Sequence, residues 1–401
     1  MNCQKRLFYF NALFDLKRLS NNRQSLKRTA DEMTTLFVPM GRESDLILLH
    51  ADVPDDYRIY LQTAGLSPPA FVSSRFSADQ HILAHPWGWD EEALRLFSSM
   101  NISSIHPDPA IVQMVNNREF LSALSDKENI GAPGSTLIHN MKEFNILIAA
   151  GNQKYPAVIK PSHGSSGFGF ILLSSPPDSS VLKQVSRLLQ FGSVVVEPWY
   201  DRKMDISSSL TLYPNGSLSG IRHCRCFVDS HGTFYGVHLA PDYFLEDQQL
   251  CSLEQKICAC ARHLRDQGYF GPVGFDSFTY TDKTGRTALA SIIEINARHV
   301  MSDIARELKQ KLAPNRHVFY RLLSSRRCKL PDNYEALKKL LAPYHFSPET
   351  RKGILPVTPL KVRTDVTRQP YRNAFFISAE NEDELFHLDA ILLQRTSQNH
   401  P

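Results

Sequence analysis

The sequence contains no apolar run that approaches the roughly 20 residues needed to span a membrane. The first residues also match a secretory signal poorly. The apolar run at residues 7–10 is short, and Asp15, Lys17 and Arg18 follow it without a small-residue cleavage site. We therefore expect residues 7–10 to form a strand or helix of the mature protein.

Cysteine is scarce, with seven residues scattered along the chain. An odd number without a regular spacing suits a reducing cytoplasm better than a disulfide framework, so we expect a cytoplasmic protein. Two Cys-x-Cys pairs occur, Cys224 with Cys226 and Cys258 with Cys260, and both would have to converge to bind zinc. The second pair lies in a helical pattern, where residues two apart diverge by about 200°, so buried thiols are the favoured interpretation.

Internal repeats, low-complexity tracts and recognisable nucleic-acid-binding modules are also missing. Residues 5–28 carry seven Lys and Arg against one acid, but a solvated helix face explains this run better than a nucleic-acid partner. The net charge of +4 argues neither for nor against an anionic partner. We expect neither nucleic acid nor a membrane as a partner.

What the sequence does contain is typical of a globular protein that is long enough for two or three domains: 401 residues, 42% apolar and 21% charged. Up to about Ile105, buried strands accompany a helix, which predicts an open α/β layer. We expect strands at residues 35–39, 46–49 and 70–73, a weaker strand pattern near Ile82, and a helix at 55–64.

Beyond His106 strands and helices continue, and two long strands form a hairpin whose turn contains Asp282 and Gly285. We expect helices at residues 111–124, 141–150, 180–190, 303–312 and 383–392, and strands at 157–161, 170–173, 193–198, 273–280, 286–296 and 374–378.

The second strand of this hairpin leads into polar residues at alternate positions, Glu294, Asn296 and Arg298. Residues two apart in a strand face the same side, so the apolar residues that alternate with them, from Ile293 onward, should face a core. Three polar groups on a buried strand are costly unless something polar lies in front of them. A hard metal ion that carries phosphate fits, with oxygen donors for the metal and a guanidinium fork for the anion.

The first hairpin strand adds another acid, Asp276. Two acids and an amide can bind one or two Mg²⁺ ions, which take phosphate oxygens and waters as further ligands. A structural salt-bridge network remains open as the alternative, with Arg298 paired to Asp303.

Two upstream segments carry further signals. The loop at residues 162–169 has three glycines and three serines, follows Lys160, and would let the backbone approach an anion closely. It is not a P-loop, because no Gly-Lys-Ser/Thr is present and a strand follows, and a plain hairpin turn remains open. Residues 195–200 run from an apolar strand into aromatic residues that could flank an adenine, although this segment alone cannot be told from core.

In order and character these blocks resemble the ATP-grasp superfamily: a lysine strand with a glycine-rich loop, a strand with Glu197, a Gly-x-Asp at Asp276, and Glu-x-Asn-x-Arg. The resemblance covers roughly residues 111–310 and implies an α/β (α+β) fold in which two α+β subdomains clasp ATP. It implies a pre-ATP-grasp α/β domain at residues 1–108, a small subdomain at 109–192, a C-terminal subdomain at 193–312, and an extension at 313–401 that packs on the ATP-grasp region.

The resemblance also implies roles for individual residues. Asp276, Glu294 and Asn296 would bind Mg²⁺ or Mn²⁺, while Arg298 and Lys160 would assist phosphoryl transfer. The family usually has a lysine where Arg118 stands, but arginine can also bind phosphate. The implied ATP site consists of Arg118, Lys160, Ser162, His163, Gly164, Ser165, Ser166, Gly167, Glu197, Pro198, Trp199, Tyr200 and Asp205.

The implied activity is that of an ATP-dependent ligase, which joins a carboxylate to an amine through an acyl phosphate and releases ADP and phosphate. Arg222 and Arg225 are candidate substrate contacts, but they face opposite sides of one strand, so at most one readily reaches the site, and a solvated edge strand remains open. His163, His238 and His299 are candidate proton acceptors, although each could equally be an incidental polar histidine.

The layout and the run from Glu294 to Met301 also resemble the pheganomycin-type peptide ligases of bacterial secondary metabolism, which implies amino acid or peptide substrates and permits a homodimer. A carboxylase or carbamoyl-phosphate-like enzyme that uses bicarbonate is the first alternative, but residues after Leu312 show neither a biotin-acceptor run nor a glutaminase motif. A non-catalytic nucleotide-binding regulator is the second, and it would be expected to have lost a metal ligand.

Overall fold

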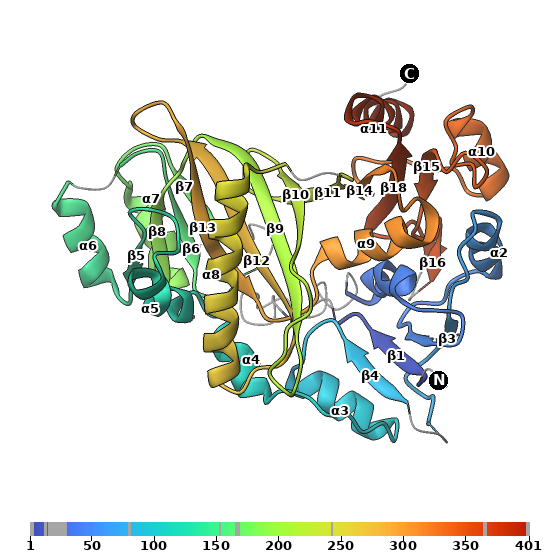
Figure 1. The fold of residues 1–401 in the computed structure, drawn as a ribbon, viewed down its shortest axis with the longest axis horizontal. Coiled ribbons are helices and arrows are strands. Elements are labelled where there is room, and N and C mark those ends of the chain that lie inside the picture. The colour runs from blue at the N-terminus through green and yellow to red at the C-terminus, as the bar shows by residue number, and fades with distance from the viewer. Residues whose placement is uncertain are drawn as a thin grey trace.

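The computed structural model describes residues 4–11, 14, 30–78, 82–151, 154–164, 169–241, 244–363 and 367–397. Figure 1 shows three regions in this part of the chain: a small sheet at one end, a long sheet through the middle, and the N-terminal domain below the far end of that long sheet.

The N-terminal domain is built on a parallel four-stranded sheet in the order β3-β2-β1-β4. Its strands are β1 (Arg6–Tyr9), β2 (Leu46–Leu48), β3 (Ala70–Val72) and β4 (Leu83–Pro86), with helices α2 (Asp55–Thr63) and α3 (Glu91–Ser99). This confirms the predicted α/β layer.

One predicted strand of this domain is wrong. Residues 35–39 belong to the 3₁₀ helix η1 (Thr34–Met40), and all seven residues of η1 are buried. A short apolar run has no periodicity that distinguishes a buried strand from a buried helical turn, which explains the error.

The small sheet is antiparallel, with the order β5-β8-β6-β7. It consists of β5 (Thr136–Ile138), β6 (Ala157–Pro161), β7 (Ile171–Leu173) and β8 (Val194–Pro198), with helices α6 (Met141–Ala149) and α7 (Ser179–Leu188) packed against it. Because β8 pairs with β5 and β6, a domain boundary at residue 193 separates this strand from its hydrogen-bonding partners.

The single helix expected at residues 111–124 is two helices, α4 (Pro109–Val115) and α5 (Arg118–Glu128). Asn117 caps the second, because its side chain accepts a hydrogen bond from the backbone N–H of Glu119. The break places Arg118 in the first turn of α5, beside the end of β6, where its backbone N–H donates to Ser162.

The long sheet is antiparallel and has eight strands in the order β13-β12-β9-β10-β11-β14-β18-β15. Its strands are β9 (Arg202–Leu212), β10 (Arg222–Val228), β11 (Phe234–Leu239), β12 (Gly271–Thr281), β13 (Thr287–Asn296), β14 (His317–Ser324), β15 (Gly353–Pro356) and β18 (Arg372–Ala379). The C-terminal region therefore extends this sheet, and it also contributes a two-stranded ladder of β16 (Val362–Arg363) and β17 (Thr367–Arg368).

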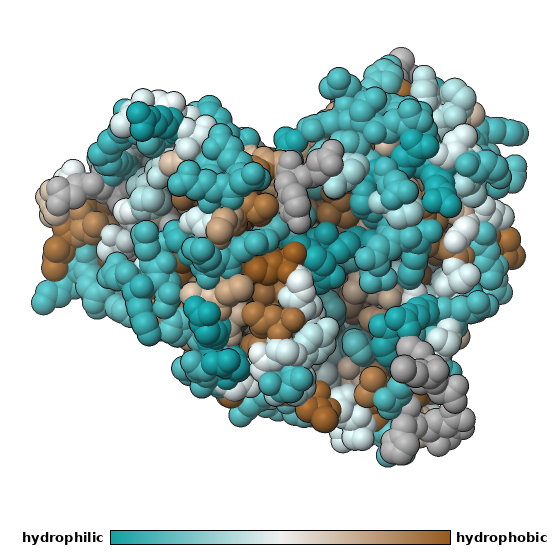
Figure 2. Space-filling view, in the orientation of Figure 1, coloured by the Kyte–Doolittle hydropathy of each residue, from teal (hydrophilic) through white to brown (hydrophobic). Residues whose placement is uncertain are grey.

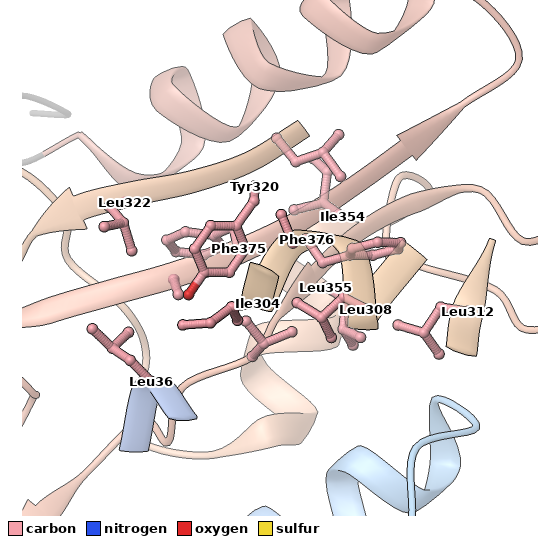
Figure 3. Packing of buried hydrophobic residues seen from close by; sticks show 14 of the residues in the cluster. Leu36, Ile304, Leu308, Leu312, Tyr320, Leu322, Ile354, Leu355, Phe375 and Phe376 are labelled. Carbon is pink, nitrogen blue, oxygen red and sulfur yellow. The ribbon is translucent and has the colours of Figure 1, made fainter. Parts of the chain in front are cut away.

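Four helices accompany this sheet: α8 (Asp247–Asp266), α9 (Met301–Leu312), α10 (Tyr334–Leu341) and α11 (Glu382–Thr396). In Figure 1, α8 lies along the half that holds β9, β12 and β13, and α9 lies between the other half and the N-terminal domain. The largest core joins this far half to the N-terminal domain, and in Figure 3 Leu36 of η1 faces Ile304 and Leu308 of α9 and the aromatic residues of β14 and β18.

None of the helices in the described part of the chain combines the length and apolarity that a membrane crossing requires. The face drawn in Figure 2 is mainly hydrophilic, and its apolar residues gather in small separate patches. Such scattered patches are normal on a folded domain.

Candidate functional site

The hairpin of β12 and β13 brings the predicted acids and amide together. In the register of these strands Asp276 pairs with Glu294 and Gly274 pairs with Asn296, so the three polar side chains lie on one face. The Asn296 amide donates to Asp276 at 3.0 Å. Burial, and next the charge of Glu294, raise the pKa of Asp276 to about 7.

This donor set suits a hard divalent cation. Two carboxylates that face each other repel, and a cation between them would remove both the repulsion and the cost of burying their charge. The described residues contain no group of three or more His, Cys, Asp or Glu side chains that could hold a metal ion, so any such site depends on the Asn296 amide oxygen as its third protein donor.

On the opposite side of this segment, Ile295 and Ala297 are buried, as predicted, in the core that includes α8. Ile293 differs, because it is only half-buried and packs with Tyr200 and Tyr280 in a separate cluster. The physical reason is a break in the strand: Ile292 has a φ of 55° and the pairing shifts register between Asp276 and Phe278. A β-branched residue at positive φ is strained, and such strain often marks functional sites.

Two predicted phosphate-binding cations lie beside this face. Arg118 is buried, pairs with Glu294 at 2.5 Å and donates to the backbone oxygen of Pro161 at 2.6 Å. Lys160 forms a buried ion pair with Glu197, and Ser135 also donates to Glu197 at 3.1 Å. Burial, followed by the positive charges of Arg202 and Arg118, lowers the pKa of Lys160, against the opposing effect of Glu197.

The segment after β8 packs into an aromatic cluster. The Tyr200 hydroxyl donates to the backbone oxygen of Pro133 at 2.5 Å, and its ring lies against Phe278 and Tyr280. The Arg202 guanidinium stacks over Trp199 and Phe278. Asp205, a predicted ribose contact, pairs with Arg202 at 2.8 Å.

The glycine-rich loop is described only in part. Ser162 is buried, and His163 and Gly164 are half-buried, whereas Ser165, Ser166 and Gly167 lie outside the described residues. His163 and Gly164 line a pocket of about 350 Å³ that continues from Glu294 and Asn296 to the first turn of α3. Its lining is Phe14, Trp89, Asp90, Glu91, Glu92, Arg95, Pro109, Ala110, Gln113, Asn116, His163, Gly164, Glu294, Ile295 and Asn296.

Arg298 is buried just beyond β13. Its guanidinium donates to the backbone oxygen of His299 at 3.0 Å and lies over the Trp87 ring. The alternative pairing of Arg298 with Asp303 is not what the structure shows. Asp303 instead accepts hydrogen bonds from Ser209 at 3.1 Å and from the backbone N–H of Val300 at 3.2 Å.

Other predicted substrate contacts separate into two groups. Arg222 lies opposite Ser209 on the face that carries Asn296 and is 3.5 Å from Asp303, while the His299 ring is 3.2 Å from the same acid. Arg225 faces the other side of the sheet and pairs with Glu382 at 2.5 Å.

His238 also lies on that other side, opposite Arg225 and 3.2 Å from His317. Burial lowers the pKa of His238 to about 4. Arg225 and His238 are therefore remote from the candidate site.

Sequence reasoning missed several residues that complete this face. Ser207 lies beside Asp276, Ser209 beside Gly274, and Arg306 of α9 lies near Arg222. Asn116 accepts a hydrogen bond from the backbone N–H of Ala297 at 2.8 Å. Ser207 and Ser209 could have been recognised from the sequence, because they alternate along a strand and polar residues two apart share a face.

No protein-family model matches the sequence, and no curated protein matches it. Solved structures do match, over nearly the whole chain. N5-carboxyaminoimidazole ribonucleotide synthetase from Thermus thermophilus aligns with a TM-score of 0.55 and 11% identity, covering 98% of this chain and 99% of that one.

The corresponding synthetase from Staphylococcus aureus has a TM-score of 0.52 and 11% identity, over 98% of this chain and all 100% of that one. Biotin carboxylase from Campylobacter jejuni has a TM-score of 0.57 and 11% identity, over 98% and 91%. At these identities the likeness concerns the fold: the chain has the ATP-grasp fold that the sequence predicted.

Proposed function

We propose that the protein is an ATP-dependent ligase that joins a carboxylate to an amine through an acyl phosphate. The observation that carries this proposal is the alignment of Asp276, Glu294 and Asn296 on one face, next to Arg118 and the start of the glycine-rich loop. An acidic cation site beside buried cations is what phosphoryl transfer needs, because the charge on the phosphates must be neutralised while they react.

In this proposal, side chains of the protein make most of the contacts with the nucleotide. Lys160 and Arg118 would bind phosphate oxygens after exchanging their present partners, Glu197 and Glu294. Residues 198–200 would hold the adenine against this aromatic cluster. Asp276, Glu294 and Asn296 would hold Mg²⁺, which when bound neutralises charge on the β- and γ-phosphates.

In the proposed reaction, a carboxylate oxygen attacks the γ-phosphorus of ATP and ADP leaves, which gives the acyl phosphate. The amine then attacks the acyl carbon, phosphate leaves, and the amine nitrogen loses a proton to form the amide. Arg298 is buried near Asp276 and would stabilise the charge that develops on oxygen in both steps.

The pocket of about 350 Å³ gives the amine a route to this centre. One end is lined by Glu294 and Asn296, and the other by three acids, Asp90, Glu91 and Glu92, together with one guanidinium, Arg95. Carboxylates at the outer end favour a positively charged amine, so we propose amino acids or small peptides as substrates, as in the pheganomycin-type ligases.

Bicarbonate as the acid is the second candidate, and the solved structures favour it. Two of the matching structures are carboxylases by name, and one of them, a 2-oxoglutarate carboxylase domain, is described in complex with MgADP and bicarbonate. The two candidates differ in which acid is required for ATP turnover.

A phosphate-release assay tests both candidates. Amino acids and small peptides are supplied singly and in pairs, with and without bicarbonate. Phosphate release that requires a pair, and ADP in equal amount, supports amide ligation, whereas release that requires bicarbonate supports carboxylation.

The variant Glu294→Gln should lower the rate by roughly 10³-fold or more, because it removes a metal-binding charge from the transition state. Glu254→Gln is the matched control, since Glu254 lies on α8 and pairs with His223 on the other side of the sheet. An unchanged rate in Glu294→Gln would contradict the proposed metal site.

A further inference from the structure

Two guanidinium groups on the candidate face have no role in the nucleotide and metal site described above. Arg222 belongs to the row that runs across the sheet from Asn296 through Gly274 and Ser209. Arg306 reaches toward the same place from α9, where burial, and then the charge of Arg222, lower its pKa. The two groups lie two strands away from Asp276, within the reach of extended arginine side chains.

The packing of α9 fixes the direction of Arg306. Ile304, Leu308 and Leu312 point into the large core, as Figure 3 shows, so a different side of the helix must carry Ser302 and Arg306, which are four residues apart. That side faces β10, since a hydrogen bond with Cys226, and then the charge of Arg306, lower the pKa of Cys224 on that strand.

These groups are short of hydrogen-bond partners. Nε and Nη2 of Arg306, Nε of Arg222 and Oγ of Ser302 are shielded from solvent, and within the part of the chain that the structure describes they have no hydrogen-bond partner. Such groups cost free energy when they are buried without a partner, so a ligand that accepts hydrogen bonds on this face would lower that cost.

Asp303, which approaches Arg222 in the described part of the chain, does not meet this need. Asp303 already accepts from Ser209 and the Val300 backbone, and it is 3.2 Å from the His299 ring. Arg222 approaches it only to 3.5 Å, at the outer limit of a hydrogen bond. Among the described residues no acid forms an ion pair with Arg306, and Asp303 meets Arg222 only at this limit, so an incoming anion would find unengaged guanidinium nitrogens.

We propose that Arg222 and Arg306 form a binding site for the reacting carboxylate of the acid substrate. This inference rests on the proposed ligase function. A carboxylate has two oxygens that match the planar forks of two guanidinium groups, and the Ser302 hydroxyl adds a further donor. The position beside Ser207 and Ser209 places that carboxylate on the same face as the acids that would hold the metal.

Binding of simple carboxylates tests the site without knowledge of the natural substrate. Acetate and succinate are added to the full-length protein, with and without MgADP, and the midpoint of thermal unfolding is compared with that in chloride at equal ionic strength. Carboxylates should raise the midpoint in wild type and in Arg225→Met, which alters the opposite face of the same strand. The rise should be lost in Arg306→Met and in Arg222→Met.

Stability without added anion separates ligand binding from a structural role. Arg306→Met keeps most of the side-chain volume and removes an unpartnered charge, so at low salt its unfolding midpoint should equal or exceed that of wild type. A lower midpoint together with an unchanged carboxylate response would overturn the proposal. An absence of any carboxylate response in wild type would also overturn it.

Kinetics then distinguish this site from the proposed function as a whole. Once an acid substrate is found, Arg306→Met should raise the KM for that acid by roughly tenfold or more while the KM for ATP stays unchanged. Arg306→Lys should recover part of the affinity. If no acid supports ATP turnover, the ligase proposal fails, whereas the carboxylate-binding result still decides the site.

Discussion

Lys160 and Glu197 form an ion pair in which both side chains are almost fully buried. Their attraction offsets the cost of removing two charges from water, but neither charge would have adequate compensation alone. The pair is therefore a fixed element of the structure in the absence of nucleotide. In the proposed reaction the same lysine must also meet phosphate.

This dual role gives a prediction about single and double variants. Lys160→Met should destabilise the protein by about 3–5 kcal/mol, because Glu197 is left buried and unpaired. The double variant Lys160→Met/Glu197→Leu should recover most of this stability, and both variants should bind ATP weakly. Urea unfolding and titration with a fluorescent ATP analogue measure the two properties.

Two results would contradict this view of the pair. A double variant as unstable as the single one would show that Lys160 stabilises the protein through more than its ion pair with Glu197. A double variant that binds ATP as tightly as wild type would remove Lys160 from the nucleotide site.

Among the secondary-structure elements, the contact between β12 and the residue that precedes α9 holds the candidate metal-binding face in place. Gly274 lies directly under Val300, the residue that precedes α9, and a Cβ atom added at Gly274 would lie 2.4 Å from a Val300 methyl carbon. Only glycine lets the helix start this close to the strand, and Asn296 is the neighbour of Gly274 on β13.

We therefore expect Gly274→Ala to lower the free energy of unfolding by about 1–3 kcal/mol, through overpacking against Val300. Combining it with Val300→Ala should restore part of the loss, so that the two changes are less than additive. Gly220→Ala is the control, since a Cβ there meets nothing within 4 Å. Denaturant unfolding of the four variants provides the comparison, and additive losses would argue against the contact.

The sequence identified elements that have strong periodicity or a distinctive turn. The hairpin that carries Asp276 and Glu294 was predictable because Asp and Gly mark its turn and its polar residues alternate. The structures of residues 35–39 and 111–124 were not predictable, because a buried apolar run has no strand-specific period and because the break at Asn117 depends on a side-chain cap.

The residues of the candidate site that the sequence did not predict have a similar explanation. Arg306 is one of several charged residues on a helix, and nothing in its local sequence shows that it faces β10 instead of solvent. That information arises from the packing of Ile304 and Leu308 against the core, which is a tertiary property. The same holds for Arg225 and His238, whose face depended on the register of β10 and β11.

On the scale of the whole molecule, the N-terminal domain and the C-terminal region share one core. The buried Tyr57 hydroxyl of α2 donates to the backbone oxygen of Val357 at 2.7 Å, and Lys311 of α9 donates to the backbone oxygens of Pro39 and Gly41. Two segments that are about 300 residues apart in sequence are thus in direct contact.

We expect these regions to unfold together. Tyr57→Phe should reduce the free energy of unfolding by about 1–2 kcal/mol, because the oxygen of Val357 loses its buried donor. Tryptophan fluorescence and far-UV circular dichroism should report the same shifted transition. Tyr213→Phe is the control, since Tyr213 is exposed; separate transitions for the two probes would contradict a shared core.

The order of these segments along the chain has a consequence for biosynthesis. Ribosomes deliver the N-terminal domain first, yet the elements that cover Leu36 and Tyr57 come from residues after 300. Nascent chains must therefore carry these apolar surfaces uncovered through most of translation, which makes them natural clients for chaperones that shield newly made protein.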